Sequence, residues 1–423
     1  MFRLTYRLSS FAAVAVFFVV KIAAAIILLM LSTSLLSVSD FAIFTQLLIL
    51  AALLNLLAIG GAQNGLVSLT AVAPSNEALA RLRDTSLRVW AFIFVLGTTM
   101  AILLRNSLSL LLVGDEAIAT SAVLVVGVTL LAGPGQIFTA ILTGRRHITA
   151  SLAAQGSGII AGTLGSIGFL VNGEAEKASI AFAAGPLVTM AMAGMILRAE
   201  KLDAFRLRQF GAQWRQLIGH SGATLVLALS TASILFGLRY VYQKAFDLDE
   251  LGYWLAASRI SDTTTQFLGL ILVQLFLPYF ATVKNPPEAR RLTFATWAGG
   301  FVIMVSIFAL FLAASGFLIS TILGPKFMPA RDGILFYLAG DVLRVWAAVA
   351  MSIQLARGRP WFYASIEIAT MVLMAAATLV GIARDQPLAP MIAYFAAYGT
   401  TALIVTLIFF RNWLMSEPKV KIS

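Results

Sequence analysis

The chain has 423 residues, of which 60% are hydrophobic and 12% charged, and its mean hydropathy is +0.92. This composition excludes a water-soluble core and indicates a protein with many membrane spans. Cysteine is absent, which excludes disulfides, thiol catalysis and cysteine-based metal sites, and the net charge of +11 is scattered among short loops, which favours a membrane protein over a nucleic-acid-binding one.

Apolar runs of about 20 residues, the length that crosses a bilayer, predict an all-α polytopic membrane protein with twelve transmembrane helices. The expected spans are residues 10–31, 41–72, 86–104, 117–142, 148–171, 179–197, 217–242, 253–282, 294–322, 333–355, 361–382 and 388–413. We expect the first to be a retained helix rather than a signal peptide, because its apolar run is too long and no A-x-A cleavage site follows.

Lysine and arginine are distributed unevenly between the two sides of these spans. Twenty of the thirty fall at the termini and in the loops of one side, six in the loops of the other side, and four inside the spans. Because basic residues accumulate on the cytoplasmic side, we expect both termini in the cytoplasm.

The longest polar segment, residues 198–216, lies near the middle of the chain. It predicts an N-lobe over residues 1–197 with helices 1–6, a basic cytoplasmic linker over 198–216, and a C-lobe over 217–423 with helices 7–12. Both lobes would begin on the cytoplasmic side, as parallel repeats do. A short echo supports the repeat, since Asp40-Phe41-Ala42-Ile43-Phe44 opens the second span as Glu250-Leu251-Gly252-Tyr253-Trp254 opens the eighth.

Charged side chains inside the spans are the strongest functional signal. They are Lys21, Arg239, Arg259, Asp262, Asp341, Arg344 and Glu367. A charge at the centre of a membrane helix costs about 2.5–3.5 kcal/mol, so these groups are expected to face one another or a watery cavity. With four positive and three negative members, the central cavity would be cationic and would suit an anionic ligand.

The spacing of these charges separates ligand candidates from internal pairs. Arg259 with Asp262, and Asp341 with Arg344, stand at i, i+3 on one helical face, so each pair is either self-neutralising or part of a gate. Lys21 and Arg239 have no partner within their own helices. They are therefore the stronger ligand candidates, with pairing to Glu367 the alternative for Arg239.

Three further polar residues are candidates for substrate contact. Asn64 either lines the cavity or bonds a neighbouring helix. Arg145 and Arg146 lie at the expected cytoplasmic mouth, where they either contact substrate or simply set the topology.

Helix breakers and small residues predict mechanical features. We expect Gly133-Pro134-Gly135, Pro186 and Pro278 to interrupt the fourth, sixth and eighth spans, and the Gly158/Gly162 pair to mark close helix packing. No phosphate-binding GxxxxGK[ST], H-E-x-x-H or G-x-S-x-G motif is present, so we expect no enzyme, no cofactor and no metal site.

Two blocks of sequence carry a family resemblance. The first is Asp249-Glu250-Leu251-Gly252-Tyr253-Trp254 with Ser258, Ile260-Ser261-Asp262 and Gln266-Phe267; the second is Lys326-Phe327, Arg331-Asp332, Gly340-Asp341-Val342-Leu343-Arg344 and Glu367. Together with Lys21-Ile22, Gln46-Leu47, Asn64-Gly65 and Arg239, they resemble Wzx-type polysaccharide flippases, especially those of enterobacterial common antigen, within the multidrug/oligosaccharidyl-lipid/polysaccharide exporter superfamily.

The resemblance implies two six-helix lobes around a central cavity, and movement of undecaprenyl-pyrophosphate-linked oligosaccharide across the bacterial inner membrane, for O-antigen-like or other surface polysaccharides. It also implies coupling to Na⁺ or H⁺ and contact with membrane lipids, a polysaccharide polymerase and chain-length machinery. The cationic side chains agree, because pyrophosphate needs cations in a desolvated pathway. Two alternatives stay open: a multidrug antiporter of the same fold, and a membrane-embedded polymerase or ligase, which would need a large external loop.

Overall fold

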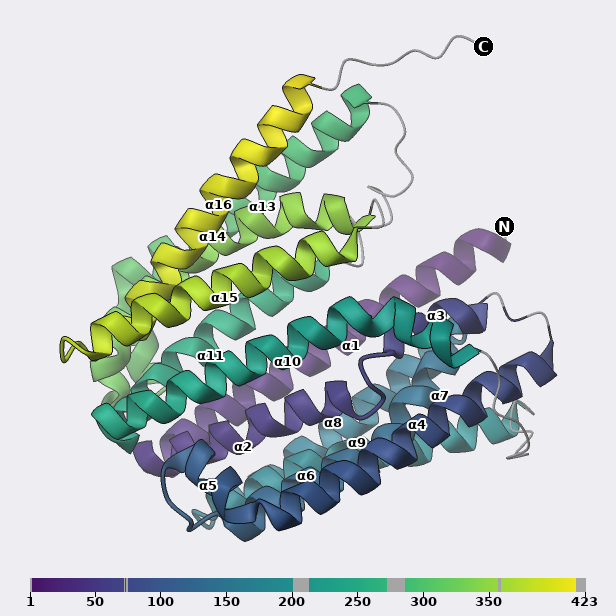
Figure 1. Cartoon of the computed structure of the whole chain (residues 1–423), viewed down its shortest axis with the longest axis horizontal. Coiled ribbons are helices and arrows are strands. Elements are labelled where there is room, and N and C mark those ends of the chain that lie inside the picture. Colours follow the sequence, from purple (N-terminus) through teal and green to yellow (C-terminus); the bar gives the residue numbers. More distant parts are fainter. Residues whose placement is uncertain are drawn as a thin grey trace. The chain divides into compact units, whose positions relative to one another are not determined.

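The computed structural model describes residues 2–71, 73, 75–200, 213–271, 286–356 and 359–415. Within these ranges all regular structure is helical, which confirms the all-α prediction (Figure 1). Ten helical segments of the described chain are long and apolar enough to cross a membrane. The protein is therefore a multi-pass membrane protein.

The other two expected spans correspond to α8 (Ile148–Leu170) and α11 (Leu248–Ile271). Five glycines, with serines and threonines, lower the hydropathy of α8, and charged residues with three consecutive threonines lower that of α11. Residues 272–282 of the expected eighth span, with Pro278, lie outside the described residues.

The chain divides into two compact units, unit 1 over Met1–Ala232 and unit 2 over Ser233–Ser423. This boundary falls within one continuous helix, α10 (Gln213–Ala245). Residues 201–212 of the expected linker lie outside the described part, so the lobe boundaries of the sequence analysis stay a prediction.

Unit 1 contains nine helices of the described chain and the beginning of α10. Besides α8, they are α1 (Phe2–Leu35), α2 (Val38–Leu57), α3 (Gln63–Ala71), α4 (Asn76–Leu103), α5 (Arg105–Val113), α6 (Ala119–Leu131), α7 (Gly133–Gly144) and α9 (Ala175–Ala199). The short α5 was not predicted; it forms between the expected third and fourth spans and packs on α2, α4 and α6.

Unit 2 contains the end of α10 and the helices that follow it. Besides α11, they are α13 (Pro286–Ile322), the 3₁₀ helix η2 (Pro325–Ala330), α14 (Arg331–Ala356), α15 (Pro360–Ile382) and α16 (Ala389–Met415). The helix α14 packs on α11, α13 and α16 (Figure 1). It is therefore the element of this unit that can bring side chains from several helices together.

The echo between the two halves corresponds to one local structure. The Ser37 side chain accepts a hydrogen bond from the Asp40 N–H (3.0 Å), and the Asp247 carboxylate accepts one from the Glu250 N–H (2.7 Å). In each case a capping side chain is followed three residues later by an acid, which stabilises a helix start. Burial, together with the charges of Asp247 and Asp249, raises the pKa of the Glu250 carboxyl above its usual value. The two helix starts therefore share one capping pattern, and the parallel repeat stays a prediction.

The expected second span, residues 41–72, is broken in the structure. The helix α2 ends at Leu57, and Gly60 (φ +63°) and Gly61 (φ +68°) adopt the left-handed conformation before α3 begins. Their N–H groups bond the carbonyls of Leu57 and Leu56, which closes the helix as a Schellman motif. The prediction of one continuous helix was wrong, because paired glycines inside an apolar run supply a helix terminus.

A second break separates α6 from α7 at Gly133-Pro134-Gly135, as predicted. Pro134 has no N–H to offer the carbonyl of Leu130 four residues earlier. The indole Nε1 of Trp90, on α4, donates to that carbonyl instead, at 2.7 Å. A Cβ added to Gly133 would lie 2.4 Å from the Trp90 ring, so only glycine leaves room for the indole.

We expect Trp90→Phe to lower the free energy of unfolding by about 1–3 kcal/mol, because the Leu130 carbonyl loses the indole donor. In a Pro134→Ala background the same substitution should cost less, since the introduced alanine restores a backbone N–H at this position. Thermal unfolding of the purified protein in detergent measures both, with the exposed Trp361→Phe as control. Equal costs of Trp90→Phe in the two backgrounds would contradict this account.

The helices α8 and α9 pack closely through glycines, as the Gly158/Gly162 pair predicted (Figure 1). A Cβ added to Gly185 would lie 2.5 Å from the Gly158 carbonyl oxygen and 3.0 Å from the Gly162 Cα. Pro186 does not interrupt α9, contrary to the prediction, because the helix is continuous from residue 175 to 199. Neighbouring helices can support a proline inside a membrane helix without a break.

Candidate substrate and coupling site

A buried carboxylate, Asp341 of α14, is the centre of a polar cluster in unit 2. Its side chain is 0% exposed. Oδ1 accepts hydrogen bonds from Ser261 Oγ of α11 (2.8 Å) and from the Tyr394 hydroxyl of α16 (2.6 Å), and Oδ2 accepts a longer one from Thr264 Oγ1 (3.4 Å). The carboxylate is therefore held by hydroxyl groups from two other helices.

The Tyr394 hydroxyl also connects Asp341 to Arg344. It donates to the carboxylate and accepts from Arg344 Nη1 at 3.2 Å. The guanidinium lies 5.3 Å from the centre of the Tyr398 ring, and the Tyr398 hydroxyl donates to Glu367 Oε2 at 3.2 Å. These five residues, here called the Asp341 network, join α14, α15 and α16. In the described chain, Asp341 and Arg344 are linked through Tyr394 rather than by a direct ion pair.

Arg239 of α10 lies beside the same aromatic cluster. It is 5% exposed, and its guanidinium lies 5.8 Å from the centre of the Trp254 ring and 6.0 Å from that of Phe236. Trp254 Nε1 donates to the Tyr337 hydroxyl (2.7 Å), and the Tyr337 and Tyr394 rings are 4.4 Å apart. A continuous aromatic array thus connects Arg239 with the Asp341 network.

Arg259 and Asp262 of α11 are both half-buried. Asp262 interacts electrostatically with Arg239 as well as with Arg259. The predicted charges Arg239 of α10 and Arg259 and Asp262 of α11 are therefore close enough to interact electrostatically.

The predicted residues of unit 1 do not form one cluster. Lys21 lies in α1 and is partly exposed, Asn64 lies in α3 with its side chain outside the described residues, and Arg145 and Arg146 end α7. Lys21 and the arginines of α10 and α11 belong to different units. Their sharing of one cavity therefore stays a prediction.

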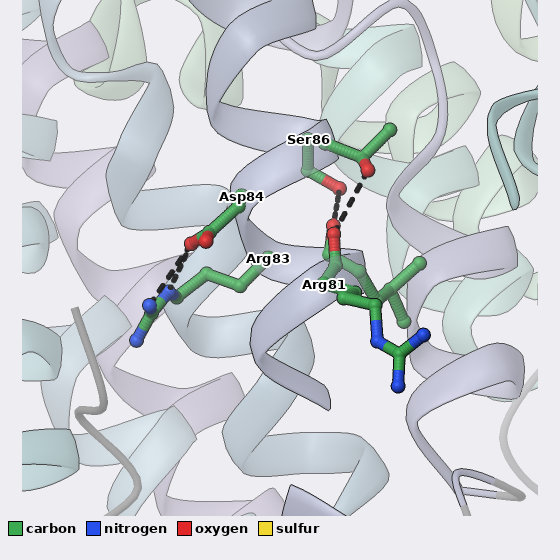
Figure 2. A network of polar contacts seen from close by, with 6 residues as sticks. Arg81, Arg83, Asp84 and Ser86 are labelled. Carbon is green, nitrogen blue, oxygen red and sulfur yellow. Dashed lines mark hydrogen bonds and ion pairs between the residues drawn. The ribbon is translucent and has the colours of Figure 1, made fainter. Parts of the chain in front are cut away.

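A buried ion pair in α4 was missed by the sequence analysis. Arg83 and Asp84 are each 3% exposed, and Nε and Nη2 of Arg83 donate to Asp84 Oδ1 at 3.2 and 2.9 Å (Figure 2). The adjacent opposite charges of Arg83 and Asp84 are the sequence feature that could have predicted this ion pair. The pair lies just before the expected third span, residues 86–104.

A further polar contact joins the two helix breaks of unit 1. The Gln136 side chain, from the first turn of α7, donates to the backbone carbonyl and to the side-chain oxygen of Asn55 in α2. A Cβ on Gly133 would lie 3.1 Å from the Cβ of Ala58, in the α2–α3 turn. The two interrupted helices therefore pack against each other at their breaks.

No family model matches the chain, and no curated protein matches it. Solved structures do. A multidrug resistance MATE family transporter of the MOP superfamily, in an inward-facing conformation, is 14% identical with a TM-score of 0.70, covering 94% of each chain. The lipid II flippase MurJ, in an inward closed conformation, is 13% identical with a TM-score of 0.72, covering 96% of this chain and 89% of MurJ.

The MATE multidrug transporter DinF-BH gives a TM-score of 0.65 at 14% identity, covering 96% of this chain and 94% of that one. At such identities the likeness concerns the fold. The chain has the all-helical membrane fold shared by MATE transporters and MurJ, which are transporters and a flippase rather than enzymes.

Proposed function

We propose that this protein is a flippase that moves undecaprenyl-pyrophosphate-linked oligosaccharide from the cytoplasmic to the periplasmic leaflet of the bacterial inner membrane. The observation that carries the proposal is the set of cations at membrane depth, above all Arg239, which is buried against aromatic rings. A pyrophosphate group is a matching ligand, because planar guanidinium groups bind phosphate oxygens through paired hydrogen bonds. The fold supports the proposal, since one protein that shares it is a lipid II flippase.

In this proposal Lys21, Arg239 and Arg259 contact the pyrophosphate, Asn64 contributes a polar contact, and Arg145 and Arg146 meet the substrate at the cytoplasmic side. The polyprenyl tail stays in the lipid. The termini are cytoplasmic, as the distribution of basic residues predicts. A polysaccharide polymerase and its chain-length machinery would use the product.

The acidic residues would provide the gate and the ion coupling. Asp262 interacts with both Arg239 and Arg259, so a substrate phosphate would compete with Asp262 for these cations. Asp341, surrounded by hydroxyl oxygens, is the proposed site at which Na⁺ or H⁺ acts, with Arg344 and Glu367 responding through the two tyrosines. Alternating access requires such contacts, because a ligand with equal affinity for both states shifts neither.

A multidrug antiporter is the second candidate, and one observation favours it. Such a protein should present buried acids and aromatic rings to cationic drugs. Asp341 accepts a hydrogen bond from Tyr394, whose ring lies 4.4 Å from that of Tyr337. Two of the described structural neighbours are MATE transporters. The flippase is preferred because Lys21 is the deeply placed charge that the sequence predicts for the first half.

Reconstitution into liposomes distinguishes the two candidates. We expect fluorescently labelled undecaprenyl-pyrophosphate oligosaccharide to become accessible to an impermeant quencher faster than in protein-free liposomes. Ethidium, a lipophilic dye cation, should not be moved under either a proton or a sodium gradient. Movement of ethidium without movement of the lipid would replace the flippase with the antiporter.

A further inference from the structure

The turn between α7 and α8 holds an arginine in an unusual conformation. Arg146 has φ +67°, its N–H bonds the Thr143 carbonyl (3.0 Å), and the His147 N–H bonds the Leu142 carbonyl (2.8 Å). These bonds form a Schellman motif, in which the left-handed residue is usually glycine. The motif fixes the backbone of Arg145, the last residue before the left-handed position.

The side chain of Arg145 is held with one edge buried and unused. Its Nε and Nη2 atoms are inaccessible to solvent and have no hydrogen-bond partner within the described chain. These two nitrogens form the side edge of the guanidinium, whose N–H groups point in parallel and suit two oxygens of one anion. An arginine cannot shed its proton, so a buried edge of this kind calls for an anion.

Arg83 shows what the same edge does when a partner is present. Its Nε and Nη2 both donate to Asp84 Oδ1, and the pair is buried (Figure 2). The chain thus supplies a carboxylate to the edge of Arg83, whereas the described chain supplies none to that of Arg145.

A second unsatisfied polar group lies beside the end of α7. Thr70 of α3 is 0% exposed, and its hydroxyl has no hydrogen-bond partner in the described residues. Gly144, which directly precedes Arg145, packs against it, since a Cβ added there would lie 2.6 Å from the Thr70 Cβ. Among the described residues, two buried donor groups without acceptors therefore belong to the neighbouring ends of α3 and α7, which contact each other at Thr70 and Gly144.

We propose that Arg145 and Thr70 form a binding site for a phosphate group. Two oxygens of the tetrahedral anion accept from Nε and Nη2 of Arg145, and a third accepts from the Thr70 hydroxyl. The phosphate comes either from a lipid headgroup or from a free phosphate compound. The site deepens the proposed function, and rests on it only for the suggestion that substrate phosphate docks there before it reaches the deeper cations. Arg146, which is exposed, is not part of the site.

Binding is measured on the full-length protein with two probes. The first is inorganic pyrophosphate added to protein in neutral detergent, followed by the shift in thermal unfolding. The second is phosphatidylglycerol in nanodiscs, compared with phosphatidylcholine and followed by native mass spectrometry of retained lipid. Binding of pyrophosphate identifies a site for free phosphate; retention of phosphatidylglycerol alone identifies a site for a lipid headgroup.

We expect Arg145→Gln to weaken binding of the effective probe by about tenfold or more, and Thr70→Val by about two- to tenfold. Arg145→Lys keeps the charge but loses the paired N–H groups, so it should bind several-fold more weakly than wild type. Arg384→Gln, at an exposed arginine, is the matched control and should bind as wild type.

Wild-type affinity in Arg145→Gln, or no binding of either probe by wild type, overturns the proposal. If Arg145→Gln does not fold, unchanged binding by Arg145→Lys and Thr70→Val overturns it. No transport is measured, so the result is independent of the flippase assay. If the wild-type protein moves the lipid in liposomes but binds neither phosphate probe, this site alone is rejected. If it binds a probe at this site but does not move the lipid, only the proposed function is rejected.

Discussion

Single replacements of Lys21, Arg239 and Arg259 by alanine are expected to abolish movement of the lipid-linked oligosaccharide. Each removes a cation proposed to hold the pyrophosphate at membrane depth, and one charged hydrogen bond contributes about 1.5–3 kcal/mol, which corresponds to at least about a tenfold loss of binding. Transport is measured in liposomes and by complementation of a flippase-deficient strain. The amount of protein in the membrane should stay near that of wild type.

Arg239 allows a sharper version of this experiment. Its guanidinium lies over the rings of Trp254 and Phe236, so Arg239→Lys keeps the charge but loses planar contact with both the rings and the phosphate. We expect partial transport from the lysine variant, between wild type and Arg239→Ala. Lys177→Ala and Arg384→Ala, at exposed positions, serve as controls. Full complementation by all three deep alanine variants would refute the role of the cations.

The helix breaks show how far the sequence predicts the membrane fold. Helices were predictable because a bilayer demands long apolar runs. The α6–α7 break was predictable because Pro134 lacks an N–H and stands between Gly133 and Gly135, whereas Pro186 did not interrupt α9. The α2–α3 break was not, since Gly60 and Gly61 are tolerated inside membrane helices as readily as they end them. The short-range hydrogen bonds that end α2 are those from Gly60 and Gly61 to the carbonyls of Leu57 and Leu56.

The candidate site also contains residues that the sequence predicted and contacts that it did not. Charges such as Asp341 and Arg344 stand out because they are costly in a membrane, so sequence alone selected them. Their connection through Tyr394 could not be predicted from the sequence, because tyrosine is an ordinary residue in a membrane protein. The hydrogen-bond partners of its hydroxyl are set by tertiary packing. Spacing at i, i+3 predicted that Asp341 and Arg344 share a face. It could not predict that a tyrosine from a different helix, α16, would stand between them.

The response of transport to an ion gradient should depend on Asp341. The carboxylate is fully buried and accepts hydrogen bonds from Ser261, Thr264 and Tyr394, an all-oxygen environment that suits either a proton or Na⁺. Asp341→Asn keeps the shape and most of the hydrogen bonding but cannot change its charge. We therefore expect transport that no longer accelerates when a proton or sodium gradient is imposed across the liposome, whereas wild type accelerates with one of them.

Tyr394→Phe separates ion binding from its transmission. It removes only the hydroxyl that donates to Asp341 and accepts from Arg344, so the carboxylate keeps Ser261 and Thr264 while the link to Arg344 is cut. Transport by this variant should be slower but still sensitive to the gradient, because the titrating or ion-binding group is intact. The unfolding free energy should fall by about 1–3 kcal/mol, since Arg344 loses a buried acceptor.

Glu174→Gln, which neutralises a solvent-accessible carboxylate paired with Lys177, controls for loss of negative charge alone. A wild-type gradient response in Asp341→Asn would reduce this carboxylate to a fixed counter-ion, and the alternating step would then have to be driven by Asp262 or Glu367, each of which can be neutralised in the same assay.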